Sequence, residues 1–297
     1  MTAHQQLSPA LEDKLAYFAT VTGSYEAAAR LAAKLGYPVE KTPARAPTAL
    51  AVLMMDGIQV CFRGPGWGKR KTVQPRVEWH EEKLGVFYRH EEAVRAERGQ
   101  LLVKVVVSWQ GEGLELGRRL HWEAMRGGLG RARAVLAVAD GAPWIWNVVT
   151  DRWKEARQLL DFYHASQHLW ALGEALAPKD EKERRRWVER GLHQMRHGEE
   201  ETVLRRIAAL PRRRGDVGAE VRREQNYFAA QAGRMDYETV ARRGWPIGSG
   251  EVESACRQRQ CRRKRPGQFW TRSGLRHLDA LEEARDHGHW DELWLTA

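Results

Sequence analysis

Three acidic residues stand where a metal-dependent phosphoryl-transfer site would need them. Asp56 and Asp140 each follow an apolar run, and Glu253 lies in the first turn of a predicted helix. Converging carboxylates repel one another, so such a group is costly unless a cation lies between them. Oxygen ligands suit Mg²⁺ or Mn²⁺, and a pair of these ions can activate a water and stabilise the departing oxygen of a phosphodiester. The pattern predicts a two-ion site whose metal ligands are Asp56, Asp140 and Glu253.

Each of these acids also has a structural interpretation. Asp56 with Gly57 is a common hairpin turn, and Asp140 could cap the helix that follows it. Glu253 could simply be a favourable charge near a helix N-terminus. The occurrence of all three in a basic chain favours the metal site. Glu251 competes with Glu253, but positions two apart on a helix differ by about 200°, so both cannot point into one pocket.

A basic run follows Glu253 on the same predicted helix. The chain carries 49 Lys and Arg against 39 Asp and Glu, a formal net charge of +10. The guanidinium fork matches phosphate, and aromatic rings can stack on bases. We expect the following residues to contact a nucleic-acid backbone: Arg257, Arg259, Arg262, Arg263, Lys264, Arg265 and Trp270. The arginine runs at 184–186 and 212–214 either contribute to this surface or are solvated helix faces.

Three further polar residues lie near the end of another predicted strand. Asp161 is either a supporting residue of the carboxylate site or a structural acid that pairs with basic neighbours. His164 and His168 have the i, i+4 spacing of a zinc pair, but no other zinc ligands accompany them. We expect them to pack or to face DNA, and we group all three as possible supporting residues.

The hydrophobic pattern predicts an α/β fold. The pattern begins with an apolar strand at 49–55 and a tight turn at 56–57. An alternating partner strand follows at 58–62 and continues at 86–88. The elements expected next are a strand at 101–109, a helix at 114–125, a strand at 134–139, a helix at 143–157, a strand at 158–162 and a helix at 164–176. This order gives a mixed sheet flanked by helices. Its first and fourth strands can be neighbours, which would bring Asp56 and Asp140 together.

The chain divides into four predicted regions. Residues 1–47 form a short helical region that resembles a degenerate helix-turn-helix, because prolines leave little room for a second helix. Residues 48–177 form the first part of a catalytic core, residues 178–245 a helical insertion, and residues 246–297 the C-terminal helices that carry Glu253. Three cysteines without zinc spacing, no membrane-length apolar run and no signal core indicate a cytoplasmic, nucleoid-associated protein without a membrane partner.

Three segments together resemble the ISKra family of bacterial insertion-sequence transposases, distant relatives of Mutator-type DDE transposases. They are Asp140-Gly-Ala-Pro-Trp-Ile-Trp, Asp161-Phe-Tyr-His-Ala-Ser-Gln-His-Leu and Gly248-Ser-Gly-Glu-Val-Glu-Ser-Ala-Cys. Residues 81–88 also fit, and the resemblance covers roughly residues 50–295. The family places its glutamate third after the glycine-serine-glycine, which selects Glu253 over Glu251.

The resemblance implies an RNase H-like core and an acidic triad at Asp56, Asp140 and Glu253, with a helical domain inserted before the glutamate. It further implies DNA transposition without a covalent protein intermediate, double-stranded DNA as element ends and target, and a homo-oligomer that pairs two ends. The N-terminal region is shorter than the DNA-binding part that the family usually carries. Two alternatives remain: a catalytically silent, transposase-derived DNA-binding protein, such as a repressor or a truncated remnant, and an RNase H-like nuclease without strand transfer.

Overall fold

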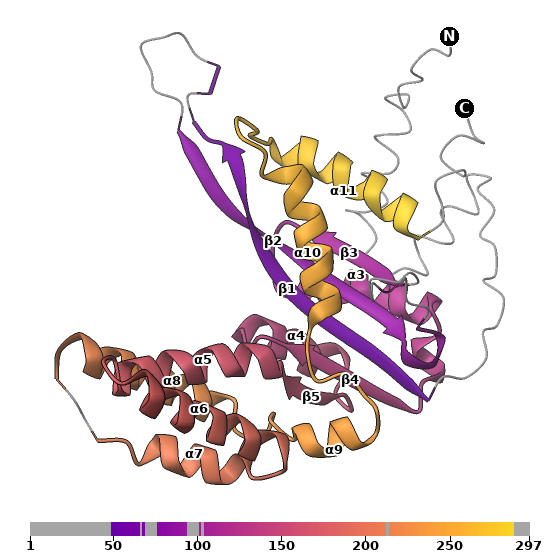
Figure 1. The fold of residues 1–297 in the computed structure, drawn as a ribbon. Helices are drawn as coiled ribbons and strands as arrows, with labels where there is room; N and C mark the ends of the chain where they lie inside the picture. The colour runs from indigo at the N-terminus through magenta and orange to yellow at the C-terminus, as the bar shows by residue number, and fades with distance from the viewer. Residues whose placement is uncertain are drawn as a thin grey trace, which may run out of the picture. The chain divides into compact units, whose positions relative to one another are not determined.

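The computed structural model describes residues 49–65, 67–68, 76–93, 101, 104–211 and 214–287. Five strands form one mixed sheet in the order β3-β2-β1-β4-β5 (Figure 1): β1 (Leu50–Arg63), β2 (Val77–Arg89), β3 (Val105–Trp109), β4 (Ala134–Ala139) and β5 (Arg157–Leu160). β1 is antiparallel to β2 and parallel to β4; β2 with β3 is antiparallel, and β4 with β5 is parallel. The predicted α/β class, the element order and the adjacency of the first and fourth strands are confirmed.

The predicted hairpin turn at Asp56 and Gly57 is wrong. β1 runs straight through this dipeptide, with Asp56 opposite Leu84 and Gly57 opposite Lys83 on β2. A two-residue turn of this type needs a positive φ at the glycine, and Gly57 does not have one. The even-numbered side chains Met54, Ile58 and Val60 stay buried on one face across the dipeptide, so burial favours one long strand. Asp56 therefore lies inside a strand, not at its end.

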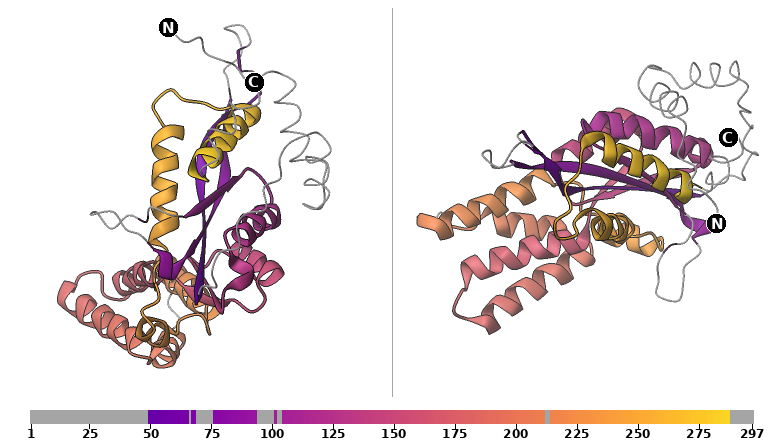
Figure 2. Two further views of the ribbon diagram at one scale, coloured as in Figure 1. Left: turned by 90° about the vertical axis from the view of Figure 1, so that its right-hand side faces the viewer. Right: turned by 90° about the horizontal axis from the view of Figure 1, so that it is seen from above.

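Helices cover both faces of the sheet (Figure 2). One face packs against α3 (Gly113–Arg126) and α4 (Pro143–Arg152), and the other against α5 (Phe162–Leu176), α10 (Gly250–Arg263) and α11 (Arg272–Asp286). Burial on both faces explains why the first half of β1 is continuously apolar. α4 ends earlier than predicted, α5 begins at the Asp161 cap, and the predicted C-terminal helices are α10 and α11. Short 3₁₀ helices occupy His90–Glu92 and Leu129–Arg131.

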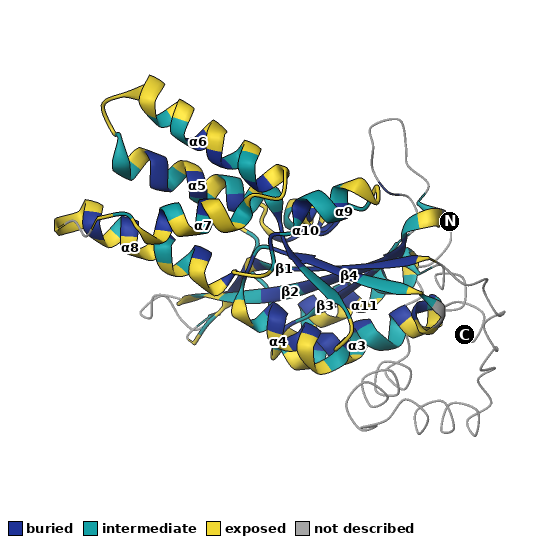
Figure 3. Ribbon diagram, turned by 90° about the horizontal axis from the view of Figure 1, so that it is seen from below, coloured by how far each residue is buried: buried dark blue, intermediate teal, exposed yellow. Residues whose placement is uncertain are grey.

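A group of helices lies between α5 and α10 in the chain. It comprises α6 (Glu181–Arg196), α7 (Glu200–Ala208), α8 (Gly215–Ala230) and α9 (Tyr237–Arg242), and no strand occurs in 178–211 or 214–245. Their inner residues, such as Val188, Met195 and Phe228, join the core that covers the α10 face of the sheet, while their outer faces are exposed (Figure 3). No helix among the described residues is long and apolar enough to cross a membrane. The predicted helix-turn-helix in residues 1–47 lies outside the described residues.

Candidate functional site: acidic residues between β1, β4 and α10

Asp56 lies within β1, and Asp140 directly follows the last residue of the neighbouring parallel strand β4. The β1–β4 register pairs Met54 with Val138, and two residues further along each chain stand Asp56 and Asp140. Both continue the alternation of side chains, including Met54 and Val138, that are buried on the face covered by α10. Because side chains alternate strictly along a strand, both carboxylates face that helix.

Helix α10 brings Glu253 to the same place. Val252, Ala255 and Cys256 are buried in the core between the helix and the sheet, and Glu253 is exposed in the first turn. Burial raises the pKa of Asp56, and the charges of Asp140 and Glu253 raise it further, against hydrogen bonds from the Gly57 N–H and the Cys256 thiol. Burial and the nearby Asp56 likewise raise the pKa of Cys256, which keeps this thiol a donor. The charges of the other two predicted acids therefore act on Asp56.

Each carboxylate has one oxygen engaged by a donor from its own segment. The Gly57 N–H donates to Oδ1 of Asp56 at 2.6 Å, and the Ala142 N–H donates to Oδ1 of Asp140 at 2.9 Å. The Ser249 hydroxyl, whose single hydrogen has its shorter contact of 2.6 Å with Asp161, also lies 3.2 Å from Oε1 of Glu253. These bonds orient the side chains, and among the described residues the second oxygens of Asp140 and Glu253 accept no hydrogen bond. In the described part of the chain, no group of three or more His, Cys, Asp or Glu residues is arranged to hold a metal ion.

Glu251 points elsewhere. Its side chain is almost completely buried and pairs with Lys104, whose Nζ lies 3.1 Å from Oε2 of Glu251. The acid of α10 whose charge acts on Asp56 is Glu253.

Asp161 has the structural role that the sequence left open. It is fully buried and caps α5 by accepting the His164 N–H at 2.8 Å. Its other oxygen accepts both the backbone N–H and the hydroxyl of Ser249, the latter at 2.6 Å. Asp161 thus ties the start of α5 to the residue that precedes α10, and Ser249 in turn contacts Glu253.

Two residues of α8 that sequence reasoning missed hold the Asp140 segment. The Tyr227 hydroxyl donates to the backbone carbonyl of Asp140 at 2.9 Å, and the Gln231 amide donates to the carbonyl of Gly141 at 3.0 Å. Gly141 has a φ of +99°, and a Cβ there would lie 3.0 Å from the Gln231 amide nitrogen. Nothing in the local sequence of α8 marks these residues, because their role depends on a contact across the fold.

The two histidines lie next to Tyr227. The ring centroids of His164 and His168 are 5.0 Å apart, and His168 stacks on Tyr227 at 3.5 Å. Nδ1 of His168 lies 2.6 Å from Oε2 of Glu224. In the residues that the structure describes, this pair belongs to no set of three metal-binding side chains, which gives the zinc interpretation no support.

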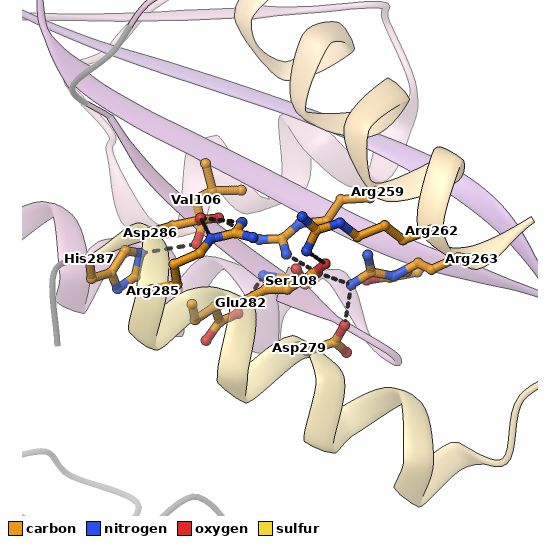
Figure 4. Close-up of polar contacts among 12 residues, drawn as sticks. Val106, Ser108, Arg259, Arg262, Arg263, Asp279, Glu282, Arg285, Asp286 and His287 are labelled. Atoms are coloured by element: carbon orange, nitrogen blue, oxygen red, sulfur yellow. Dashed lines mark hydrogen bonds and ion pairs between the residues drawn. The ribbon is translucent and has the colours of Figure 1, made fainter. Parts of the chain in front are cut away.

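The basic run is divided between the surface and the interior, as Figure 4 shows for its buried part. Arg257, Lys264 and Arg265 are exposed, and the half-exposed Arg262 pairs with Glu282 at 3.1 Å. The prediction is wrong for Arg259 and Arg263. Both are buried in ion pairs: Arg259 with Glu282 and Asp286, and Arg263 with Glu82, Asp279 and Glu282. They share the helical stripe of the buried Val252 and Cys256, so their guanidinium groups face the protein interior.

Trp270 also differs from its predicted role. Its indole N–H donates to the carbonyl of Arg263 at 3.1 Å, and its backbone N–H donates to the carbonyl of Cys61 at 3.0 Å. The partly buried ring joins the end of β1 to the segment after α10. These contacts assign it to packing.

No protein-family model matches the sequence, and no curated protein matches it at a significant level.

Proposed function

We propose that this protein is a DDE-class transposase that cleaves double-stranded DNA and transfers strands at the ends of an insertion sequence. The observation that carries the proposal is the placement of Asp56 in β1, Asp140 at the end of the adjacent parallel strand β4 and Glu253 in the first turn of α10, which packs on that face of the sheet; the charges of Asp140 and Glu253 raise the pKa of Asp56. The mixed sheet and the helical segment between Asp140 and Glu253 agree with the RNase H-like core that the family resemblance implies.

The donor set suits hard divalent cations. Asp56, Asp140 and Glu253 would hold one or two Mg²⁺ or Mn²⁺ ions through carboxylate oxygens. The bound ions would supply water activation and charge stabilisation of the departing oxygen. The protein's own contribution is orientation: the Gly57 and Ala142 N–H groups and the Ser249 hydroxyl each fix one carboxylate. The raised pKa of Asp56 marks an unfavourable concentration of negative charge, which a cation would relieve.

The exposed part of the basic run would contact the DNA backbone. Arg257 lies one turn after Glu253 on the helix. At a rise of 1.5 Å per residue, Lys264 lies about 16 Å beyond Glu253 along the helix axis. Exposed Arg257, Lys264 and Arg265, with half-exposed Arg262, therefore extend away from the carboxylates. Contacts of this kind position DNA without reading its sequence. Pairing of two element ends would need a second copy of the chain, so we include a homo-oligomer in the proposal.

One observation favours a second candidate, a catalytically silent DNA-binding protein derived from a transposase. The described residues contain no group of three or more metal-binding side chains arranged to hold a metal ion. Such a protein would keep the exposed arginines and would not depend on the carboxylates.

The deciding experiment is cleavage and joining of a plasmid that carries the DNA flanking the gene, with Mg²⁺, Mn²⁺ or EDTA. Wild type is compared with Asp140→Asn and Glu253→Gln. Glu251→Gln is the matched control, because Glu251 lies in the same helical turn but faces Lys104. Metal-dependent cleavage and joining that both test variants lose and the control keeps would support the transposase. Cleavage without joining would indicate a nuclease, and salt-sensitive binding without cleavage would indicate the silent protein.

A further inference from the structure

Glu224 on α8 is a fully buried carboxylate near the acidic site. The function proposed above gives it no role. Nδ1 of His168 lies 2.6 Å from its Oε2, and Nε of Arg223 donates to its Oε1 at 3.0 Å. Burial opposes ionisation, but the hydrogen bonds and charges of His168 and Arg223 hold the pKa of Glu224 below its usual value. Glu224 is therefore an ionised acceptor in the interior, directed at an imidazole.

This contact fixes the histidine. An ionised carboxylate can only accept, so the Nδ1 that faces it carries the hydrogen. The neutral ring then has its acceptor lone pair on Nε2, which has no hydrogen-bond partner within the described ranges. The ring cannot turn freely, because it lies flat on Tyr227 with an interplanar angle of 16°. One quarter of the side chain remains exposed.

The fixed imidazole lies beside the carboxylate site. Tyr227, on which it stacks, donates its hydroxyl to the backbone carbonyl of Asp140 at 2.9 Å. The charged and titratable groups around His168 are His164 on its own helix, Glu224, Arg223 and Tyr227 on α8, and Asp140 and Asp161 nearby. Two contacts, the stacking on Tyr227 and the hydrogen bond from the Tyr227 hydroxyl, thus connect the His168 ring to the backbone of Asp140.

We propose that His168 is a catalytic general base of this site and that Glu224 is its positioning residue, both for the reaction proposed above and resting on it. Nε2 takes a proton of the attacking water, or of the 3′-hydroxyl in strand transfer, while the oxygen of that nucleophile forms the new bond to phosphorus. The bond from phosphorus to the departing 3′-oxygen breaks, and that oxygen leaves with the electron pair and takes a proton from solvent. The imidazolium then gives its proton to solvent. The segment between β5 and α10 would thus supply part of the chemistry, through α8.

The test is single-turnover cleavage of the flanking-DNA plasmid with Mn²⁺, measured from pH 5.5 to 9. His168→Ala should slow cleavage by about 100-fold, the low end of what general bases contribute, with plasmid affinity changed less than about threefold. Glu224→Gln should slow it by about 10-fold, as the loss of an orienting carboxylate does. Added imidazole should restore part of the rate of His168→Ala, and the acid limb of the pH profile should move in both variants.

Two controls separate chemistry from folding. His168→Asn keeps a donor toward Glu224 but has no basic nitrogen, so it should fold like wild type and cleave slowly. His197→Ala is the matched control, because His193 and His197 form another i, i+4 pair on α6, with exposed side chains and ring centroids 4.1 Å apart.

The failure of this inference differs from the failure of the proposed function. Wild-type cleavage with unchanged rates in His168→Ala and His168→Asn would overturn the role of His168 and leave the transposase proposal intact. Slow variants without imidazole rescue and with an unmoved acid limb would show a merely structural role and would overturn it as well. If the wild-type protein did not cleave the plasmid with Mg²⁺ or with Mn²⁺, both proposals would be overturned.

Discussion

Arg263 of α10 and Glu82 of β2 are in direct contact in the interior, both fully buried, with Nε of Arg263 2.8 Å from Oε2 of Glu82. Nη2 of the same guanidinium lies 2.5 Å from Oδ1 of Asp279 and 2.8 Å from Oε2 of Glu282, both on α11. One side chain therefore connects the helix that carries Glu253 to the sheet and to the C-terminal helix. Charge in the basic run that the sequence assigned to DNA serves here to position α10.

Substitution of Arg263 should lower the free energy of unfolding by several times more than substitution of an exposed arginine. Arg263→Met would leave the Asp279 and Glu282 carboxylates with less counter-charge in a buried site, and breaking such a group costs about 3–5 kcal/mol. Arg265→Ala, at an exposed position, should change the free energy of unfolding by less than about 0.5 kcal/mol. Urea unfolding of the two variants measures the difference. Equal stabilities would mean that the buried pairs contribute nothing net.

The same group should make stability depend on pH. Burial and the neighbouring Asp279 carboxylate raise the pKa of Glu82 to about 8, from a usual value of 4.5. The folded state therefore holds a proton that the unfolded chain releases, so this contribution is complete below pH 4.5 and is lost as the pH rises through 8. Within that window the free energy of unfolding should fall by up to about 1.4 kcal/mol per pH unit.

Glu82→Gln isolates this contribution, because glutamine keeps the shape without the titration. Urea unfolding from pH 5 to 9 should give a flatter curve for the variant, and the difference from wild type should grow as the pH rises. Parallel curves for the two proteins would contradict the raised pKa.

Features that depend on neighbouring residues in the sequence could be predicted, and features that depend on contacts with distant residues could not. Strand β4 and the start of α4 were predicted correctly because an apolar run followed by a proline is a local pattern. The hairpin at Asp56 failed because a local turn signal competed with burial of Ile58 and Val60, which depends on the opposite layer. The burial of Arg259 and Arg263 could have been found, since both continue the helical stripe of Val252 and Cys256.

Other features could not be found from local patterns. Tyr227 and Gln231 hold the Asp140 segment from far along the chain, and no spacing rule connects them. Glu224 would read as one more charge on a polar helix until α8 packs against α5. The metal ions, the DNA and the strand-transfer step remain predictions, because they concern molecules that the fold alone does not specify.

The acidic site should itself limit stability. Burial and the charges of Asp140 and Glu253 raise the pKa of Asp56, so ionised Asp56 destabilises the folded state and its cost increases as the pH rises through that pKa. Asp56→Asn should raise stability at pH 7.5 without metal by about 1 kcal/mol while abolishing cleavage. In thermal unfolding experiments, increasing Mn²⁺ should raise the melting temperature of wild type and leave that of Asp56→Asn nearly unchanged. Equal metal-induced shifts would contradict a metal site at Asp56.

Asp161 should affect stability and cleavage through its hydrogen bonds with Ser249. Asp161→Asn weakens the cap of α5 and the two hydrogen bonds from Ser249, and a buried polar group left without a partner costs about 1–3 kcal/mol. Ser249→Ala removes only the hydroxyl that contacts Asp161 and Glu253, so it should cost less stability and still slow cleavage. Comparison of melting temperatures with single-turnover rates separates the two effects. A Ser249→Ala protein with wild-type cleavage would show that this hydroxyl does not orient Glu253.

The salt dependence of DNA binding should identify which arginines contact phosphate. Each phosphate contact contributes about 0.9 to the slope of log K against log salt concentration. Arg257→Ala and Arg265→Ala should each reduce that slope by about this amount without changing stability, since both side chains are exposed. Arg185→Ala is the matched control, because Arg185 is also exposed but pairs with Glu189 on α6. Fluorescence anisotropy of a labelled duplex between 50 mM and 200 mM salt measures the slopes over the range in which phosphate contacts dominate affinity. If Arg185→Ala lowered the slope as much as the other two, the effect would come from net charge, and the surface along α10 would not be the DNA contact.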